Sequence, residues 1–329
     1  MKLNWGTNMA RLIGRAIFKI CRLLISSCKL LLGTVVAIKV GKPTIFKFLS
    51  IIARLQNSEL KQLFHIENGN SDTGQEILSL RLGEKHSSFA ISNKSGSELY
   101  ELAYCSVDSW NENEVTAFFS AFSCLQNSFY KVQVVYDFRE SLLISTSNYS
   151  PDIAGLVLNM VSGGNSSNTN IVSEQIPEWQ LYNIYAVPKE IHEWINKKFS
   201  SARFWHQNTI GIKNITATGS DGCLLVDIRK DDFSVLAAKD SKILLAQTYT
   251  YATPEDILFY LLKICQQFSL SQREVELQLS GLIDKQSALY KELFQYFITI
   301  TFREASWNVR NDYPAHFFTA LNDLAKCGL

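Results

Sequence analysis

This sequence of 329 residues lacks most of the short motifs that mark a catalytic or metal site. Its seven cysteines include no Cys-x-x-Cys pair, so their spacing predicts neither a zinc site nor a disulfide framework. Gly41-Lys42 has Val36 where the P-loop pattern needs its first glycine and is followed by Pro43, which excludes a phosphate-binding P-loop. His192-Glu193 begins like a zinc-protease helix, but Asn196 stands where the second histidine belongs. No Gly-x-Ser-x-Gly occurs, which removes the common serine hydrolase motif.

Acidic residues are absent from the first 58 residues, which carry ten Lys and Arg. Arg11, Arg15, Lys19 and Arg22 recur at steps of four, four and three, so they form one basic stripe on a predicted amphipathic helix. Two interpretations stay open: a helix that lies on an anionic membrane surface, or translated upstream sequence that is not part of the native protein. A membrane-spanning helix is disfavoured because Lys29 interrupts the apolar run.

The remainder of the chain is acidic. Ten of the 32 basic residues lie in the first 58, which leaves 22 basic residues against all 31 acidic ones. An acidic body argues against a nucleic-acid-binding surface, since phosphate contacts need clustered cations. Apolar content of 47% and charged content of 19% are ordinary for a globular protein. Cysteines within apolar runs favour free thiols in a reducing cytoplasm, so we expect a cytoplasmic protein. We also expect a protein partner, which the sequence does not identify.

Short runs with alternating apolar residues dominate from residue 76 onward. The first half of this region predicts strands at 76–83, 87–92, 98–107, 131–138, 141–146, 181–187 and 202–206. It predicts helices at 112–127 and 149–161. The stretch 162–170 reads as a polar loop.

The same order then repeats. The second half predicts strands at 222–228, 232–238, 242–250, 275–279 and 297–303, and helices at 253–268, 286–295 and 314–326. Such a repeat predicts an internal duplication with halves at 76–215 and 216–329. The expected fold class is α/β, with two mixed five-stranded sheets, flanking helices and a cleft between the halves.

Two damaged copies of one motif stand at equivalent strand ends. Residues 80–83 read Leu-Arg-Leu-Gly and residues 226–229 read Val-Asp-Ile-Arg. An intact copy would read Asp-x-Gly. The first copy has Arg81 for the aspartate and keeps Gly83, whereas the second keeps Asp227 and has Arg229 for the glycine.

This order of elements, with these motifs, resembles the actin-like ATPase superfamily, whose duplicated fold is ribonuclease-H-like, and within it the pilus-assembly actin-like proteins. More narrowly, the chain is similar to an uncharacterised bacterial family, domain of unknown function 3822. The supporting segments are residues 78–82, 246–249 and 252–260. The family implies no known activity. The expected function therefore comes from the resemblance to the superfamily alone.

The resemblance implies a nucleotide in the cleft. In the superfamily, each Asp-x-Gly glycine lets the backbone approach phosphate, each aspartate orients Mg²⁺, and a Gly-Gly turn packs on the adenosine. Here that turn corresponds to residues 280–283, Ser-Gly-Leu-Ile. The positions that match are Gly83, Asp227 and Gly281. The positions that depart are Arg81, Arg229 and Leu282.

The departures predict a degenerate nucleotide site. Arg81 in place of a carboxylate repels Mg²⁺, so we expect no catalytic residue, no metal and no resident cofactor. The function predicted is a non-catalytic actin-like scaffold. The alternative is an ATP-binding switch that hydrolyses weakly or not at all, with Arg81 meeting a phosphate and ATPase as its only activity. A third reading, a nuclease, would need several convergent carboxylates, but Asp227 and Asp137 belong to different halves.

Overall fold

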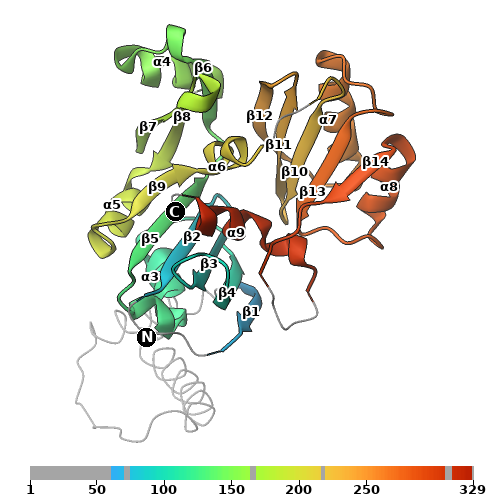
Figure 1. The fold of residues 1–329 in the computed structure, drawn as a ribbon. Coiled ribbons are helices and arrows are strands. Elements are labelled where there is room, and N and C mark those ends of the chain that lie inside the picture. The colour runs from blue at the N-terminus through green and yellow to red at the C-terminus, as the bar shows by residue number, and fades with distance from the viewer. Residues whose placement is uncertain (1–60, 70–74, 164–167, 216–218, 308–312, 328–329) are drawn as a thin grey trace, which may run out of the picture. The chain divides into compact units, whose positions relative to one another are not determined.

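The computed structural model describes residues 61–69, 75–163, 168–215, 219–307 and 313–327 (Figure 1). All of them belong to one compact unit that spans residues 58–329. The predictions for residues 1–58 lie outside the described residues. In the described part, no helix combines the length and apolar character needed to cross a membrane.

The first sheet contains six strands in the order β1-β4-β3-β2-β5-β9. Strands β2, β3 and β4 form an antiparallel meander, and β5 and β9 add in parallel. Their bounds are β1 Lys61–Glu67, β2 Ile77–Gly83, β3 His86–Ser92, β4 Leu99–Ser106, β5 Lys131–Asp137 and β9 Arg203–His206. Helices α3 (Glu112–Ala121) and α5 (Lys189–Lys198) pack on one face, where they share an apolar core with β2, β3 and β5.

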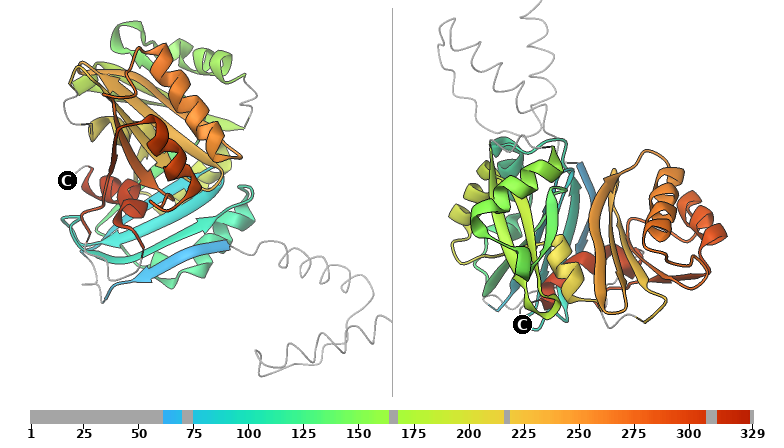
Figure 2. Two further views of the ribbon diagram at one scale, coloured as in Figure 1. Left: turned by 90° about the vertical axis from the view of Figure 1, so that its right-hand side faces the viewer. Right: turned by 90° about the horizontal axis from the view of Figure 1, so that it is seen from above.

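The second sheet repeats this arrangement in the order β12-β11-β10-β13-β14. The bounds are β10 Cys223–Ile228, β11 Asp232–Lys239, β12 Lys242–Thr250, β13 Glu276–Gly281 and β14 Thr299–Phe302. Helices α7 (Pro254–Gln267) and α8 (Ala288–Tyr296) cover one face (Figure 2). Strand by strand, β10 corresponds to β2 and β13 to β5, with the same parallel and antiparallel pairings. The predicted duplication is therefore confirmed.

Two strands were not predicted. Strand β1 pairs antiparallel with β4 and makes the first sheet six-stranded, where five strands were expected. Strand β7 (Thr169–Ile176) joins β6 (Ser141–Ser145) and β8 (Leu181–Pro188) in a separate three-stranded sheet beside α4 (Pro151–Ser162). Both strands are at edges, and their side chains are mostly exposed or half-buried, so their sequences carry little apolar alternation.

The C-terminal helix α9 (Thr319–Lys326) follows η4 (Ala315–Phe318) and returns to the first sheet, where it lies against β2 and β3 (Figure 1). Phe318 and Leu321 join an apolar cluster with Leu102 and Tyr104. Leu324 packs with Val135 of β5 and Ile210 of α6 (Gln207–Lys213). The last helix of the second half thus covers the second face of the first sheet.

We expect this docking to matter for stability. Replacing the fully buried Leu324 by alanine should lower the free energy of unfolding by about 3 kcal/mol, because lost burial and a residual cavity add. Chemical denaturation measures this loss. The exposed Leu156 of α4 offers a matched control, since Leu156→Ala should change stability by less than about 0.5 kcal/mol. Equal effects of the two substitutions would contradict the docking of α9.

Candidate functional site

A buried cluster of arginines and aspartates occupies the place where the two damaged motifs meet. Arg81 lies on β2 and is only 4% exposed. Its Nη2 donates to Asp137 Oδ2 at 2.6 Å and to Asp227 Oδ2 at 2.5 Å. Asp137 ends β5, beside Gly83 in the parallel register, and Asp227 lies on β10 of the other half. One guanidinium therefore joins carboxylates from both halves.

Arg229 completes the cluster from the second half. Its Nη1 donates to Asp227 Oδ2 at 3.1 Å and lies 3.3 Å from Asp137 Oδ2. Its Nε donates to Asp232, at the start of β11. Arg229 therefore pairs both with Asp227 and with its neighbour Asp232. Arg229 fills the hairpin position where the intact motif would bring bare backbone to a phosphate.

The opposite charges in the cluster stabilise the ionised forms of its arginines and aspartates. Burial alone would raise the pKa of Asp137, but the guanidiniums of Arg229 and Arg81 hold it well below its usual range. Arg81 and Arg229 lower the pKa of Asp227 against the same effect of burial. Burial lowers the pKa of His86, so its imidazole stays neutral at pH 7. Two cations then face three carboxylates, those of Asp137, Asp227 and Asp232, and the cluster carries a net charge of −1.

Gly83 matches the superfamily motif, but the structure gives it a different neighbour. A Cβ at Gly83 would overlap the imidazole of His86. That ring stacks on Tyr104 with centroids 5.6 Å apart, and its Nε2 lies 3.3 Å from Asp137 Oδ2. The glycine leaves room for a histidine that contacts the cluster, a role that no sequence motif indicates.

Gly281 also has a structural reason to be glycine. Its φ is +81°, and a Cβ there would overlap the backbone oxygen of Ile228, its partner in the β10–β13 register. The preceding Ser280 donates from Oγ to Asp227 Oδ1 at 3.0 Å. Of the three residues carried over from the superfamily, Asp227 and Gly281 are therefore close together, and Gly83 reaches the cluster through His86.

One small cavity lies beside the cluster. A cavity of about 30 Å³ is lined by Asp227 together with Asn208, Ser234, Ser280 and Arg303. This volume is close to the share of one water molecule in the liquid, about 30 Å³. Pockets for nucleotide-sized ligands occupy about 300–1,000 Å³. As described, this cavity does not hold a nucleotide.

Asp137 is a residue of the cluster whose role the sequence does not predict. The sequence disfavours a nuclease site made of Asp137 and Asp227, because the two residues belong to different halves. The structure brings Asp137, Asp227 and Asp232 to one place, but the guanidiniums of Arg81 and Arg229 lie between their oxygens. A two-metal nuclease needs those oxygens for its ions, so this arrangement favours ion pairing over metal binding.

Comparison with known proteins agrees with this architecture. The model of a family described as "Protein of unknown function (DUF3822)" matches residues 67–300. A Bacteroides thetaiotaomicron protein with actin-like ATPase fold and unknown function is similar at 21% identity over 79% of this chain and 100% of that one, with a TM-score of 0.68. A search of curated proteins found no match.

Two further solved structures are more distant. The ethanolamine utilization protein EutJ from Carboxydothermus hydrogenoformans is 8% identical over 80% of this chain and 93% of its own, with a TM-score of 0.44. A chain of a PilM-PilN type IV pilus biogenesis complex is 13% identical over 76% and 97%, with a TM-score of 0.48. The fold is that of actin-like ATPases, and the resemblance drawn from the sequence is confirmed.

The role of Gly281 can be tested by substitution. Gly281→Ala should destabilise the protein by at least about 2 kcal/mol, because alanine at positive φ is strained and its Cβ meets the β10 backbone. Gly155, inside α4 and open to a side chain, is the matched control. Gly155→Ala should be neutral or stabilising by up to about 1 kcal/mol. Denaturant unfolding of both variants gives the comparison, and a neutral Gly281→Ala would contradict the strand contact.

The lowered pKa of Asp137 predicts a pH-dependent stability. Its stabilising contribution is complete above the pKa of an unfolded aspartate, about 3.9, and is lost as the pH falls below that value. At pH 7, Asp137→Asn should cost about 3–5 kcal/mol, since it leaves buried guanidinium charge uncompensated. The difference in unfolding free energy between Asp137→Asn and the wild type should become smaller as the pH approaches 3.

Asp231→Asn is the matched control for that experiment, because Asp231 is exposed and precedes the buried Asp232. It should change stability by less than about 0.5 kcal/mol at each pH. Unfolding curves at pH 7, 5, 4 and 3 supply the measurement. An Asp137→Asn variant as stable as Asp231→Asn at pH 7 would show that the cluster does not stabilise the fold.

Proposed function

The chain belongs to the DUF3822 family, and we propose that it acts as a non-catalytic actin-like scaffold whose former nucleotide cleft is closed by its own charged side chains. The observation that carries the proposal is the position of Arg81. Its guanidinium is buried and bonded to carboxylates from both halves, Asp137 and Asp227. In a working actin-like site, a metal ion and phosphates would occupy this region. Here protein charges take their place.

Electrostatics oppose the entry of a nucleotide. A triphosphate would have to displace carboxylates from Arg81 or Arg229 and would meet a cluster that already carries a net charge of −1. Freed carboxylates would then be buried without partners, which costs several kcal/mol for each ion. Mg²⁺ would meet guanidiniums before it reached Asp227. Both effects favour a binding role for the fold over ATP hydrolysis.

An interaction role needs an accessible surface. Helix α4 exposes apolar side chains on its outer side, among them Leu156 and Met160, the latter 76% exposed. Exposed apolar side chains that gather on one element are typical of protein contact surfaces. They support a protein partner, and we propose that the contact takes place in the cytoplasm. Contact of residues 1–58 with a membrane surface stays a prediction from their basic stripe.

Nucleotide titration tests the proposal. The full chain is heated with and without about a hundredfold excess of ATP over a 10 µM dissociation constant, with Mg²⁺ and with a chelator. Binding of that strength would stabilise the protein by about 2.7 kcal/mol. For a domain of this size, such a gain raises the melting temperature by at least about 5 °C. We expect a shift below about 1 °C and no phosphate release.

If ATP does bind, a pair of variants tests the rival proposal, an ATP-binding switch in which Arg81 holds the phosphate. Saturable micromolar binding to the wild type would overturn the scaffold proposal. If Arg81 holds the phosphate, Arg81→Gln should then abolish the binding. Arg303→Gln is the matched control, because Arg303 lines the cavity beside Asp227 but pairs with Asp323. Circular dichroism establishes that each variant is folded before its titration.

A further inference from the structure

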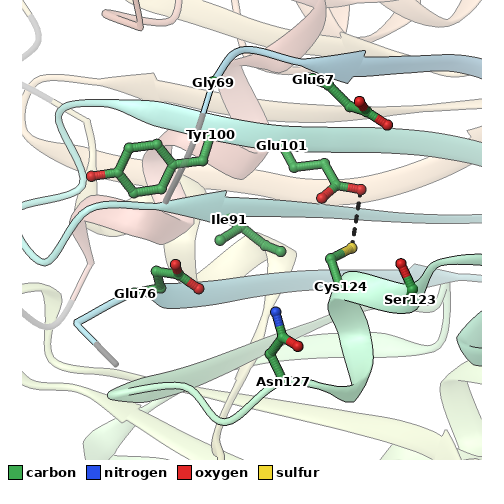
Figure 3. A pocket seen from close by; sticks show the side chains of 9 residues that line it. All are labelled: Glu67, Gly69, Glu76, Ile91, Tyr100, Glu101, Ser123, Cys124 and Asn127. Carbon is green, nitrogen blue, oxygen red and sulfur yellow. Dashed lines mark hydrogen bonds between the residues drawn. The ribbon is translucent and has the colours of Figure 1, made fainter. Parts of the chain in front are cut away.

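A second pocket lies on the first sheet, outside the arginine–carboxylate cluster (Figure 3). Its volume of about 320 Å³ falls within the range of small-molecule sites, about 300–1,000 Å³. Three glutamates line it: Glu67 of β1, Glu76 just before β2, and Glu101 of β4. None of the described residues that line the pocket is a lysine or an arginine. The pocket therefore carries negative charge that no lining cation balances.

The strand register places these glutamates on one face of the sheet, around an apolar residue. Glu67 pairs with Glu101 across the β1–β4 ladder, and Glu101 pairs with Ile91 across the β3–β4 ladder. Ile91 in turn pairs with Leu78 of β2, two residues after Glu76. Residues two apart along a strand share a face, so Glu76 lies on the same side of the sheet as Ile91. Figure 3 shows Ile91 between Glu76 and Glu101.

Glu76 points to a ligand independently of the charge count. It is only 2% exposed, and its Oε1 has no hydrogen-bond partner in the part of the chain that the structure describes. A buried carboxylate oxygen without a partner is costly. A donor bound in the pocket would remove this cost, and a positively charged donor would also compensate the charge of Glu76.

Glu101 is held in place by two neighbours. Its Oε1 is 2.9 Å from His65 Nε2 and accepts from the Cys124 thiol at 3.0 Å, the contact drawn in Figure 3. Cys124 lies in η1 (Ser123–Gln126), and burial together with the hydrogen bond to Glu101 raises the pKa of its thiol. The thiol therefore stays protonated, and a protonated thiol does not bind metal. This pocket favours an organic cation over a metal ion.

The spacing of the charges indicates the shape of that cation. Strand β3 separates β2 from β4, so Glu76 and Glu101 arise from chain segments about 10 Å apart, twice the strand spacing of about 4.8 Å. A linear diamine has an ammonium group at each end and apolar methylenes between them. Its ends match two carboxylates, and its methylenes match the apolar Ile91 that lies between Glu76 and Glu101.

We propose that this pocket binds a linear aliphatic diamine or polyamine. One ammonium group donates to Glu76 at the buried end, the methylenes lie over Ile91, and a second ammonium group donates to Glu101. The exposed fraction of the side chain rises from 21% at Glu101 to 76% at Glu67, so Glu67 attracts the ligand at the mouth. The bound cation also relieves the opposition of Glu67 and Glu101, because like charges directly opposite each other destabilise a sheet.

Calorimetric titration of the full chain with putrescine tests the site. We expect saturable binding that weakens as salt is added, because salt screens the attraction between ammonium and carboxylate groups. Butylamine has the same chain length but one ammonium group for two carboxylates, so it should bind at least about tenfold more weakly. Butanediol, which has the same length and no charge, should not bind.

Glu76→Gln should lower the affinity for putrescine at least about tenfold. Without ligand it should be at least as stable as the wild type, because it removes a buried charge that has no partner. Glu98→Gln is the matched control: Glu98 is exposed just before β4 and does not line the pocket, so this variant should keep the affinity. Circular dichroism establishes that each variant is folded.

Two more variants complete the test. Glu101→Gln should also weaken putrescine binding at least about tenfold. Glu67 has a largely exposed side chain, so Glu67→Gln should fold normally and bind putrescine only several-fold more weakly. Absence of saturable putrescine binding would overturn the proposal. So would equal affinity for butylamine, binding that survives both Glu76→Gln and Glu101→Gln, or tighter binding of Mg²⁺ or Zn²⁺ than of putrescine.

Discussion

The ion pair between Arg81 and Asp227 is the interaction on which the site depends, because it joins the two halves of a duplicated fold through buried charges. Neither charge is stable there alone. Burial disfavours an isolated carboxylate, and an isolated guanidinium cannot lose its charge. Asp137, Arg229 and Asp232 extend the pair into a network in which the larger pKa shifts all favour the charged forms.

This constraint underlies the proposal that the chain keeps an actin-like fold without hydrolysing ATP. The actin-like architecture places the ends of β2 and β10 opposite each other, and in a nucleotide-binding protein a metal and phosphates balance the charges there. Here Arg81 and Arg229 provide the positive charge that the metal would bring. The carboxylates of Asp137, Asp227 and Asp232 occupy the positions around them that phosphate oxygens would need. Function therefore has to be argued from these side chains and not from the fold.

The sequence predicted the duplication and the order of most strands, because strand alternation and motif position are local signals. It did not predict that Arg81 contacts Asp227. It did not predict the part played by Asp137, since contacts between halves depend on tertiary packing. Strands β1 and β7 were missed because edge strands have weak apolar alternation. Gly83 was assigned to phosphate contact, whereas its neighbour is His86, and that role is visible only from the ring position.

A double-mutant cycle between Arg81 and Asp227 tests the central claim most directly. Unfolding free energies of the wild type, Arg81→Met, Asp227→Asn and the double variant give the coupling energy between the two side chains. A buried pair that joins the halves predicts a coupling of at least about 1.5 kcal/mol. Additive effects within about 0.5 kcal/mol would contradict the account, because Arg81 and Asp227 would then not hold the halves together.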